Sequence, residues 1–330
     1  IEYIDAGNLV TTGIEDSELY QLFNGYLKYT DVLNLVGVDF GYNISNFNLS
    51  STTDSFLSNA PITQYANIDD YGTLPFLAPN DNLSYIRLIY KDSTGTQIGT
   101  ENVDRLTVNG AYDSYNGYIG MNLLYFGCFP ANLQNWSTIF QALVTAGTIQ
   151  GGSIVIQAFD NVPDRIAQQC IINLNCPTLK GYEPIRLTWL NQWGVWDYYT
   201  FTMKSSKTIS TKGSTYQQLA GSWNESAYRI DSFKGGKKAF RVNATEKISM
   251  NTDFVSESES EWFEELINSP EVYILKGYDD VVETNSALNQ YVTPVRLITS
   301  SYTKKTVAND KLMQYTFEVE KSKTLRTQAV

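Results

Sequence analysis

Neighbouring carboxylates are the residues of this chain that could act as a general acid and base in hydrolysis. They occur at Asp69-Asp70, Glu264-Glu265 and Asp279-Asp280. Hydrolysis of a glycosidic bond needs two carboxyl groups held several ångströms apart across the substrate. Sequence neighbours do not establish that geometry, and we expect Glu264 and Glu265 to face solvent on a helix. A carboxylate-dependent glycan depolymerase is therefore the least favoured of the functions considered.

The segment Phe233 to Arg241, FKGGKKAFR, sets glycines beside lysines and invites comparison with a phosphate-binding loop. A P-loop has four residues between its glycines and a Ser or Thr after the lysine, because the backbone wraps the phosphates and the hydroxyl holds magnesium. This segment has neither feature. We interpret Lys234, Lys237 and Lys238 as part of a solvated basic turn or a protein interface. The formal charge of -11 points away from nucleic acid as a partner.

Histidine is absent from all 330 residues. Its absence removes Ser/His/Asp and Cys/His triads, histidine general bases and histidine-rich metal sites. The three cysteines, Cys128, Cys170 and Cys176, contain no CxxC pair, so metal binding by thiolates is not expected. We expect three reduced, mostly buried thiols, with a Cys170–Cys176 disulfide as the alternative. The sequence thus predicts a non-enzymatic protein with no catalytic residue, metal or cofactor.

Aromatic residues gather in one short stretch, at Trp189, Trp193, Trp196, Tyr198 and Tyr199. Large aromatic side chains pack in cores, anchor subunit contacts and stack on sugar rings. We favour core packing, and a subunit interface and a carbohydrate platform remain the alternatives. These five residues, together with Lys234, Lys237 and Lys238, are the candidate interface residues of the chain.

The elements that must position these residues are mainly strands. In the first half, Leu83 to Lys91 followed by the turn DSTG predicts a hairpin, and Gly152 to Phe159 predicts another strand. One helix ended by Gly147 is expected. It rests on apolar residues at steps of three and four, which are Trp136, Ile139, Phe140, Leu143 and Val144.

In the second half, Ile185 to Met203 predicts two paired strands broken at the NQWG turn. The serine- and threonine-rich stretch Ser205 to Thr215 is expected to be an exposed loop. Ser256 and Glu259 form a capping box that predicts an amphipathic helix near 257–268. Its apolar stripe is Trp262, Phe263, Leu266 and Ile267. Further strands are expected at Ala239–Met250, Val272–Leu275, Pro294–Ser300 and Leu312–Glu320.

Charge divides the chain into two parts. Residues 1–180 carry 6 basic and 17 acidic side chains, whereas residues 181–330 carry 18 of each. We place a domain boundary near Lys180. The predicted fold is mainly β, with two β-rich domains, sandwich or barrel-like, and two or three short helices. Residues 1–180 form an acidic, sandwich-like domain and residues 181–330 a neutral β-rich one. No stretch reaches the roughly 18 apolar residues of a membrane span, so no membrane is expected as a partner.

Five segments of the second half carry a resemblance to known proteins. In chain order they are PIRLTWLNQWGVWDYYTF, TYQQLAGSWN, FKGGKKAFRVNATEKISMNTDF, EWFEELINSPEVYI and PVRLITSSYTKKTVANDKLMQYTFEVEKS. In this order, residues 182–326 resemble a module of virion structural proteins of tailed bacteriophages, particularly tail or baseplate components. The resemblance implies that residues 181–330 are a tail-assembly module, and it brings no catalytic residues with it.

The function expected from this resemblance is that of a structural subunit of a phage virion. Its partners would be copies of itself and other tail or virion proteins, and it would be located in the virion after assembly in the host cytoplasm. The alternative is a receptor-binding adhesin of the tail tip, in which aromatic platforms contact host surface glycans.

Overall fold

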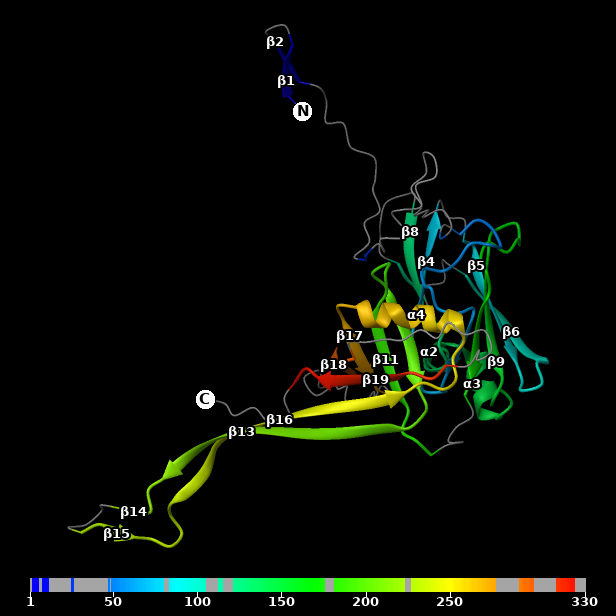
Figure 1. Cartoon of the computed structure of the whole chain (residues 1–330). Coiled ribbons are helices and arrows are strands. Elements are labelled where there is room, and N and C mark those ends of the chain that lie inside the picture. The colour runs from blue at the N-terminus through cyan, green and yellow to red at the C-terminus, as the bar shows by residue number, and fades with distance from the viewer. Residues whose placement is uncertain are drawn as a thin grey trace.

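The computed structural model describes residues 2–5, 8–11, 25–26, 47, 49–79, 83–104, 112–114, 121–175, 181–222, 227–276, 291–299 and 313–323. Strands dominate this part of the chain, in which there are three helices (Figure 1). The predicted mainly β fold is therefore confirmed. A separate hairpin of β1 (Glu2–Asp5) and β2 (Asn8–Thr11) lies near the N-terminus.

Two sheets built from the first half of the chain enclose one core. The larger has the strand order β3 (Thr63–Ala66), β10 (Cys170–Leu174), β9 (Ser153–Phe159), β5 (Tyr85–Lys91) and β6 (Gln97–Asp104). The smaller has the order β4 (Leu74–Pro79), β8 (Met121–Phe126) and β7 (Tyr112–Ser114). Alternate residues of β5 are buried with Phe76 and Leu124 of the smaller sheet. The two sheets thus form a sandwich, and the predicted β5–β6 hairpin is confirmed.

Two short helices stand where the sequence predicts one. Helix α2 (Pro130–Trp136) ends at Trp136, and α3 (Thr138–Thr145) begins after it. Ser137 separates them because its backbone is extended and its hydroxyl accepts a hydrogen bond from the Phe140 N–H, which caps α3. The prediction that Trp136 shares a helix with Ile139 is therefore wrong. Gly147, with φ +70°, follows the end of α3 as expected.

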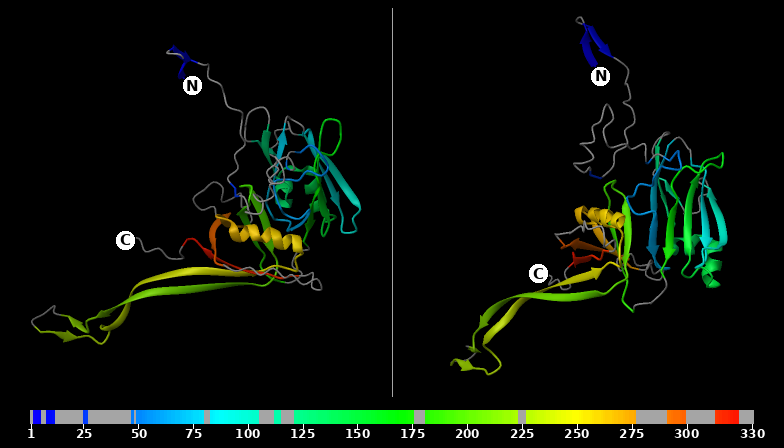
Figure 2. Two further views of the ribbon diagram at one scale, coloured as in Figure 1. Left: turned by 45° about the horizontal axis from the view of Figure 1, so that its top comes forward. Right: turned by 45° about the vertical axis from the view of Figure 1, so that its right-hand side comes forward.

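The second half forms a seven-stranded sheet with one helix against it. Its strand order is β12 (Trp196–Phe201), β11 (Ile185–Leu190), β17 (Val272–Leu275), β18 (Val292–Leu297), β19 (Thr316–Lys321), β16 (Gly236–Asn251) and β13 (Ser205–Gln218). Helix α4 (Glu257–Asn268) has the predicted capping box of Ser256 and Glu259. Figure 2 shows α4 lying across this sheet, beside the sandwich.

The apolar stripe of α4 forms the centre of the second core. Trp262, Phe263 and Leu266 are buried with Trp189 of β11 and Phe317 of β19. Their rings contact one another, with 4.9 Å between the ring centroids of Trp189 and Trp262.

The prediction that Glu265 faces solvent is wrong, because its exposed fraction is 1%. Glu265 follows Trp262 by three residues, and that spacing places it on the buried face of α4. There its carboxylate accepts hydrogen bonds from the Asn59 side chain and the Gln192 backbone N–H.

Buried polar contacts join the two halves of the chain. Asp197 of β12 accepts hydrogen bonds from the Ser58 hydroxyl and the Trp262 indole N–H, each at 2.7 Å. The Asn191 side-chain amide donates to the Leu57 carbonyl at 3.0 Å. The sandwich core draws its buried residues from 49–174 and the second core from 185–319. The predicted boundary near Lys180 lies outside the described residues.

Stability should fall with rising pH in a window set by Asp197. Burial raises the pKa of Asp197 from 3.8 to about 6, against the opposing effect of its hydrogen bonds from Ser58 and Trp262. The folded chain therefore holds this proton more tightly than the unfolded chain, and stability declines between about pH 4 and pH 6 by about 3 kcal/mol. Urea unfolding of the wild type and Asp197→Asn across this range checks the effect. Parallel pH profiles for the two proteins would exclude this role of Asp197.

Candidate functional site

Strands β13 and β16 form an arm, residues 205–251, and all residues outside it are called the body. The arm runs far beyond the body (Figures 1 and 2). The two strands pair antiparallel from Ser205 opposite Met250 to Gln218 opposite Gly236. Strand β19 lies beside β16 at the inner end of β16 only, where it pairs with Lys247–Asn251. Among the described residues, the outer part of each arm strand therefore has the other as its sole strand neighbour.

The predicted loop at Ser205 to Thr215 is wrong, because these residues belong to β13. Threonine and isoleucine are β-branched and suit a strand, and β16 supplies a partner for every residue of this stretch. At the far end, β14 (Gly221–Ser222) pairs with β15 (Arg229–Ile230). Gly235 and Gly236 adopt φ +92° and +78°, which returns the chain into β16.

One face of the arm continues the core face of the seven-stranded sheet. Alternate residues of a strand share a face, so Ile248, Glu246, Ala244 and Val242 lie on the same side of β16. Ile248 is buried in the core, and Glu246 pairs with Lys321 at 2.7 Å near the rim of the body. Beyond that rim, Val242 is 36% exposed, and Ile209, which lies opposite Glu246 on β13, is 63% exposed. The core face thus extends into solvent without a cover in the described structure.

The outer arm is rich in exposed apolar side chains. Eight of the fifteen exposed large hydrophobic residues in the described structure lie on it, and they are Ile209, Tyr216, Leu219, Tyr228, Ile230, Phe233, Phe240 and Val242. Four of them, Leu219, Ile230, Phe233 and Phe240, are more than 70% exposed. A surface this rich in exposed apolar side chains is typical of a place where another molecule binds.

The arm is also basic, whereas the rest of the chain is strongly acidic. Residues 205–251 hold eight Lys and Arg against three Asp and Glu, a formal charge of +5. The remaining residues therefore carry a formal charge of -16, which together with the +5 of the arm gives the total of -11. The neutral second half predicted from the sequence is thus the sum of a basic arm and an acidic remainder.

The three candidate lysines lie at the far end of the arm. Lys234 forms an ion pair with Asp231 at 2.7 Å, in the turn that precedes β16. Lys237 and Lys238 follow on β16, and both are exposed. Their placement fits the interpretation of the FKGGKKAFR segment as a solvated basic turn or an interface.

The five candidate aromatic residues lie in the body, away from these lysines. Trp189 and Trp193 are 0% and 4% exposed, so the core alternative holds for both of them. Tyr198 packs on the sandwich core and Tyr199 on the second core, each partly buried. Trp196 is half-buried, with its ring 5.6 Å from that of Tyr273. The structure does not bring these aromatic residues together with the candidate lysines.

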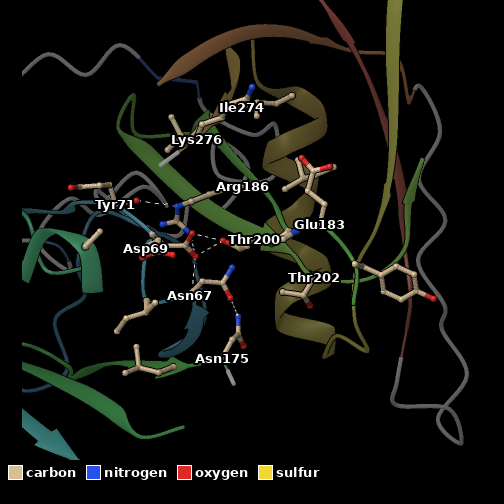
Figure 3. Close-up of a pocket in the computed structure, with 18 of the residues that line it drawn as sticks. Asn67, Asp69, Tyr71, Asn175, Glu183, Arg186, Thr200, Thr202, Ile274 and Lys276 are labelled. Atoms are coloured by element: carbon tan, nitrogen blue, oxygen red, sulfur yellow. Dashed lines mark hydrogen bonds and ion pairs between the residues drawn. The ribbon is translucent and has the colours of Figure 1, made fainter. Parts of the chain in front are cut away.

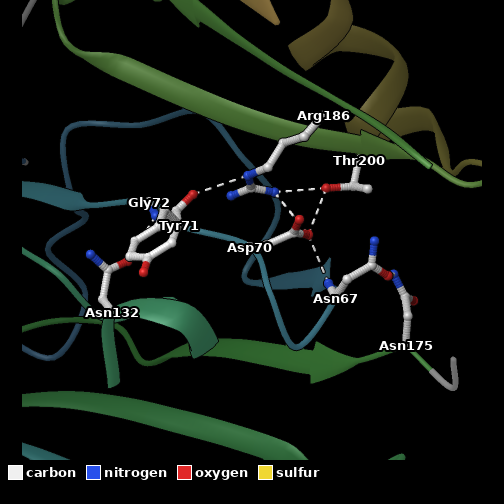
Figure 4. A network of polar contacts seen from close by, with 8 residues as sticks. All are labelled: Asn67, Asp70, Tyr71, Gly72, Asn132, Asn175, Arg186 and Thr200. Atoms are coloured by element: carbon white, nitrogen blue, oxygen red, sulfur yellow. Dashed lines mark hydrogen bonds and ion pairs between the residues drawn. The ribbon is translucent and has the colours of Figure 1, made fainter. Parts of the chain in front are cut away.

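The carboxylate pair at Asp69-Asp70 borders an open cavity of about 1120 Å³ between the two halves of the chain (Figure 3). Asp70 lies 3.3 Å from the Arg186 guanidinium and accepts hydrogen bonds from the Thr200 hydroxyl and the Asn67 N–H (Figure 4). The Arg186 Nε–H donates to the Tyr71 carbonyl at 3.0 Å. Asp70 is thus engaged in a buried structural network. The pair Asp279-Asp280 lies outside the described residues.

The remaining chemical groups among the described residues are cysteines and carboxylates. Within the described ranges, no group of three or more Cys, Asp and Glu residues could hold a metal ion. Cys128 and Cys170 are free and buried, and burial raises the pKa of Cys170 to about 12. Cys176 lies outside the described residues. None of the helices described reaches the length and hydropathy of a membrane span.

Comparison with known proteins adds no relative to this picture. No protein-family model and no curated protein sequence matches the chain.

Sequence reasoning identified the lysines of the arm but missed its apolar residues. Ile209, Val242 and Phe240 stand in a serine-, threonine- and lysine-rich context that does not look like an interface. A partial signal was available in Ala239 to Met250, where apolar residues alternate with polar ones. Its partner strand, Ser205 to Gln218, does not alternate, so the hairpin itself has no such signal.

Proposed function

We propose that this chain is a structural subunit of a phage virion, in the tail or baseplate, and that it acts through protein–protein contacts made by the arm. The observation that carries the proposal is the set of exposed apolar side chains along the arm and at its far end. The resemblance of residues 182–326 to tail and baseplate components supports the location in a virion.

The energetics of the arm favour a covered state. Fully burying a Leu, Ile or Phe side chain contributes about 1.5–3 kcal/mol. Leu219, Ile230, Phe233 and Phe240 are all more than 70% exposed, so a partner that covers them gains most of that amount from each. Burial of these side chains therefore offsets part of the free-energy cost of association.

Mass photometry of the purified chain over a range of concentrations, with negative-stain imaging of the larger species, tests this proposal. We expect particles larger than a monomer, in the form of closed rings or tubes. A chain that stays monomeric and binds host glycans on an array would favour the receptor-binding adhesin instead.

A triple variant of the arm tests the contact element. Replacing Ile230, Phe233 and Phe240 by serine should weaken assembly by about 100-fold or more, because three exposed apolar side chains no longer contribute to the contact. Replacing Ile62 and Tyr65 by serine is the matched control, since both are exposed large side chains outside the arm. Equal weakening by the two sets of substitutions would contradict the role of the arm.

A further inference from the structure

We propose that the arm of one copy binds to the acidic body of a second copy, so that the chain assembles head to tail. This inference rests on the proposed function and names the partner of the arm. The body again comprises all residues outside 205–251.

Charge complementarity selects the partner. The arm carries +5 and the body -16, so an arm and a body attract each other. Two arms would bring like charges together, which opposes pairing of one arm with another. The basic residues are also spread along the arm, with Lys212 and Arg241 on its middle and Lys237 and Lys238 farther out.

The projection of the arm favours a separate molecule as its partner. Strand β13 has 14 residues, and at about 3.3 Å per residue it spans about 45 Å. Both views of Figure 2 show the arm projecting away from the body. The exposed residues at its far end, such as Ile230 and Phe233, therefore lie out of reach of the described residues of their own body.

The contact joins two different surfaces, the arm of one copy and the body of the next. Two copies that exchange arms reciprocally form a closed two-fold dimer, and otherwise the contact repeats from copy to copy. Repetition gives a ring where the rotation between copies closes, and an open filament where it does not. The inference thus accounts for the rings or tubes expected from the proposed function.

An arm-shortened variant tests the inference. Replacing residues 211–244 by Asn-Gly would connect Ser210 and Thr245, which lie opposite each other, by a short turn. The described residues of the part removed are exposed or half-buried, and none of them belongs to a hydrophobic core, so an unchanged melting temperature is expected as the control for folding. The variant keeps the body, which would receive an arm, and lacks the outer arm that would bind another copy.

Two results are expected from this variant. Alone, it should stay monomeric, and when immobilised it should still capture the full-length chain, because its body receives the other copy's arm. Added to assembling full-length chain, it should end the growth of rings or tubes and shift the mass distribution to short species.

Two results would overturn the inference, and they separate it from the proposed function. Self-association of the full-length chain without capture by the arm-shortened variant would indicate that arms pair with arms. A full-length chain that stays monomeric but joins other virion proteins would leave the proposed function standing and exclude a second copy as the partner.

A charge reversal on the arm tests the electrostatic part. The variant K237E/K238E/R241E should bind the arm-shortened chain at least tenfold more weakly at low salt, and the difference should shrink as salt rises. The charge-conserving variant K237R/K238R/R241K is the matched control and should bind like the wild type. Unchanged binding after charge reversal would contradict charge complementarity as the basis of partner choice.

Discussion

Replacing Arg186 by alanine is expected to lower the free energy of unfolding by about 3–5 kcal/mol. The guanidinium is buried, lies 3.3 Å from the Asp70 carboxylate and donates to the Thr200 hydroxyl at 2.8 Å. It also lies over the rings of Phe129 and Tyr198, at 4.8 and 5.2 Å from their centroids. Its removal leaves the buried charge of Asp70 without its cation and opens the contact between the two halves. Chemical unfolding monitored by tryptophan fluorescence measures the loss.

A double variant separates the effect of the charge from that of the packing. Replacing Arg186 by methionine and Asp70 by asparagine removes both charges and keeps most of the volume. We expect this pair to be less destabilised than Arg186→Ala alone, because no buried charge is left unpaired. A loss below about 1 kcal/mol for Arg186→Ala would show that the network contributes little to holding the halves together.

Replacing Phe263 by alanine should destabilise the chain by about 3–5 kcal/mol. Phe263 is fully buried at the centre of the aromatic core. Its ring lies 4.8 Å from that of Tyr199 and 5.4 Å from that of Phe317. Truncation leaves a cavity among large rigid rings, which cannot collapse to fill it.

Phe254→Ala is the matched control for Phe263→Ala. Phe254 precedes α4, and its side chain is 58% exposed, so its truncation should change the free energy of unfolding by less than about 0.5 kcal/mol. Similar losses for the two variants would contradict the position assigned to Phe263. Thermal and urea unfolding of both proteins under one set of conditions measure the difference.

Elements with local signals could be predicted from the sequence. The capping box at Ser256 and Glu259 marks the start of α4, and the NQWG turn separates β11 from β12. Both signals lie within a few residues of what they determine. The mainly β fold follows from many such signals.

The arm could not be predicted in this way, because its pairing is not local. Ser205 and Met250 lie opposite each other, and only the fold brings them together. The serine and threonine content of β13 is typical of loops as well as of strands that face water on both sides. Strand β13 is exposed because the hairpin extends beyond the body, and a short stretch of sequence does not show how far a hairpin extends.

The candidate site was predicted in part for the same reason. The lysines of the FKGGKKAFR segment belong to the arm, whereas Trp189 and Trp193 are core residues. An aromatic cluster in a sequence does not say which of its rings face a neighbouring layer. Glu265 shows the converse, because its helical phase with Trp262 placed a charged residue inside the protein.

Hydrogen–deuterium exchange of the full-length chain, compared between dilute monomer and assembled particles, tests the central claim most directly. If the chain acts through its arm, amides of residues 209–218 and 237–244 should exchange more slowly in the particles, because a partner covers both strands. Unchanged exchange along the arm, with protection appearing only on the body, would contradict the account.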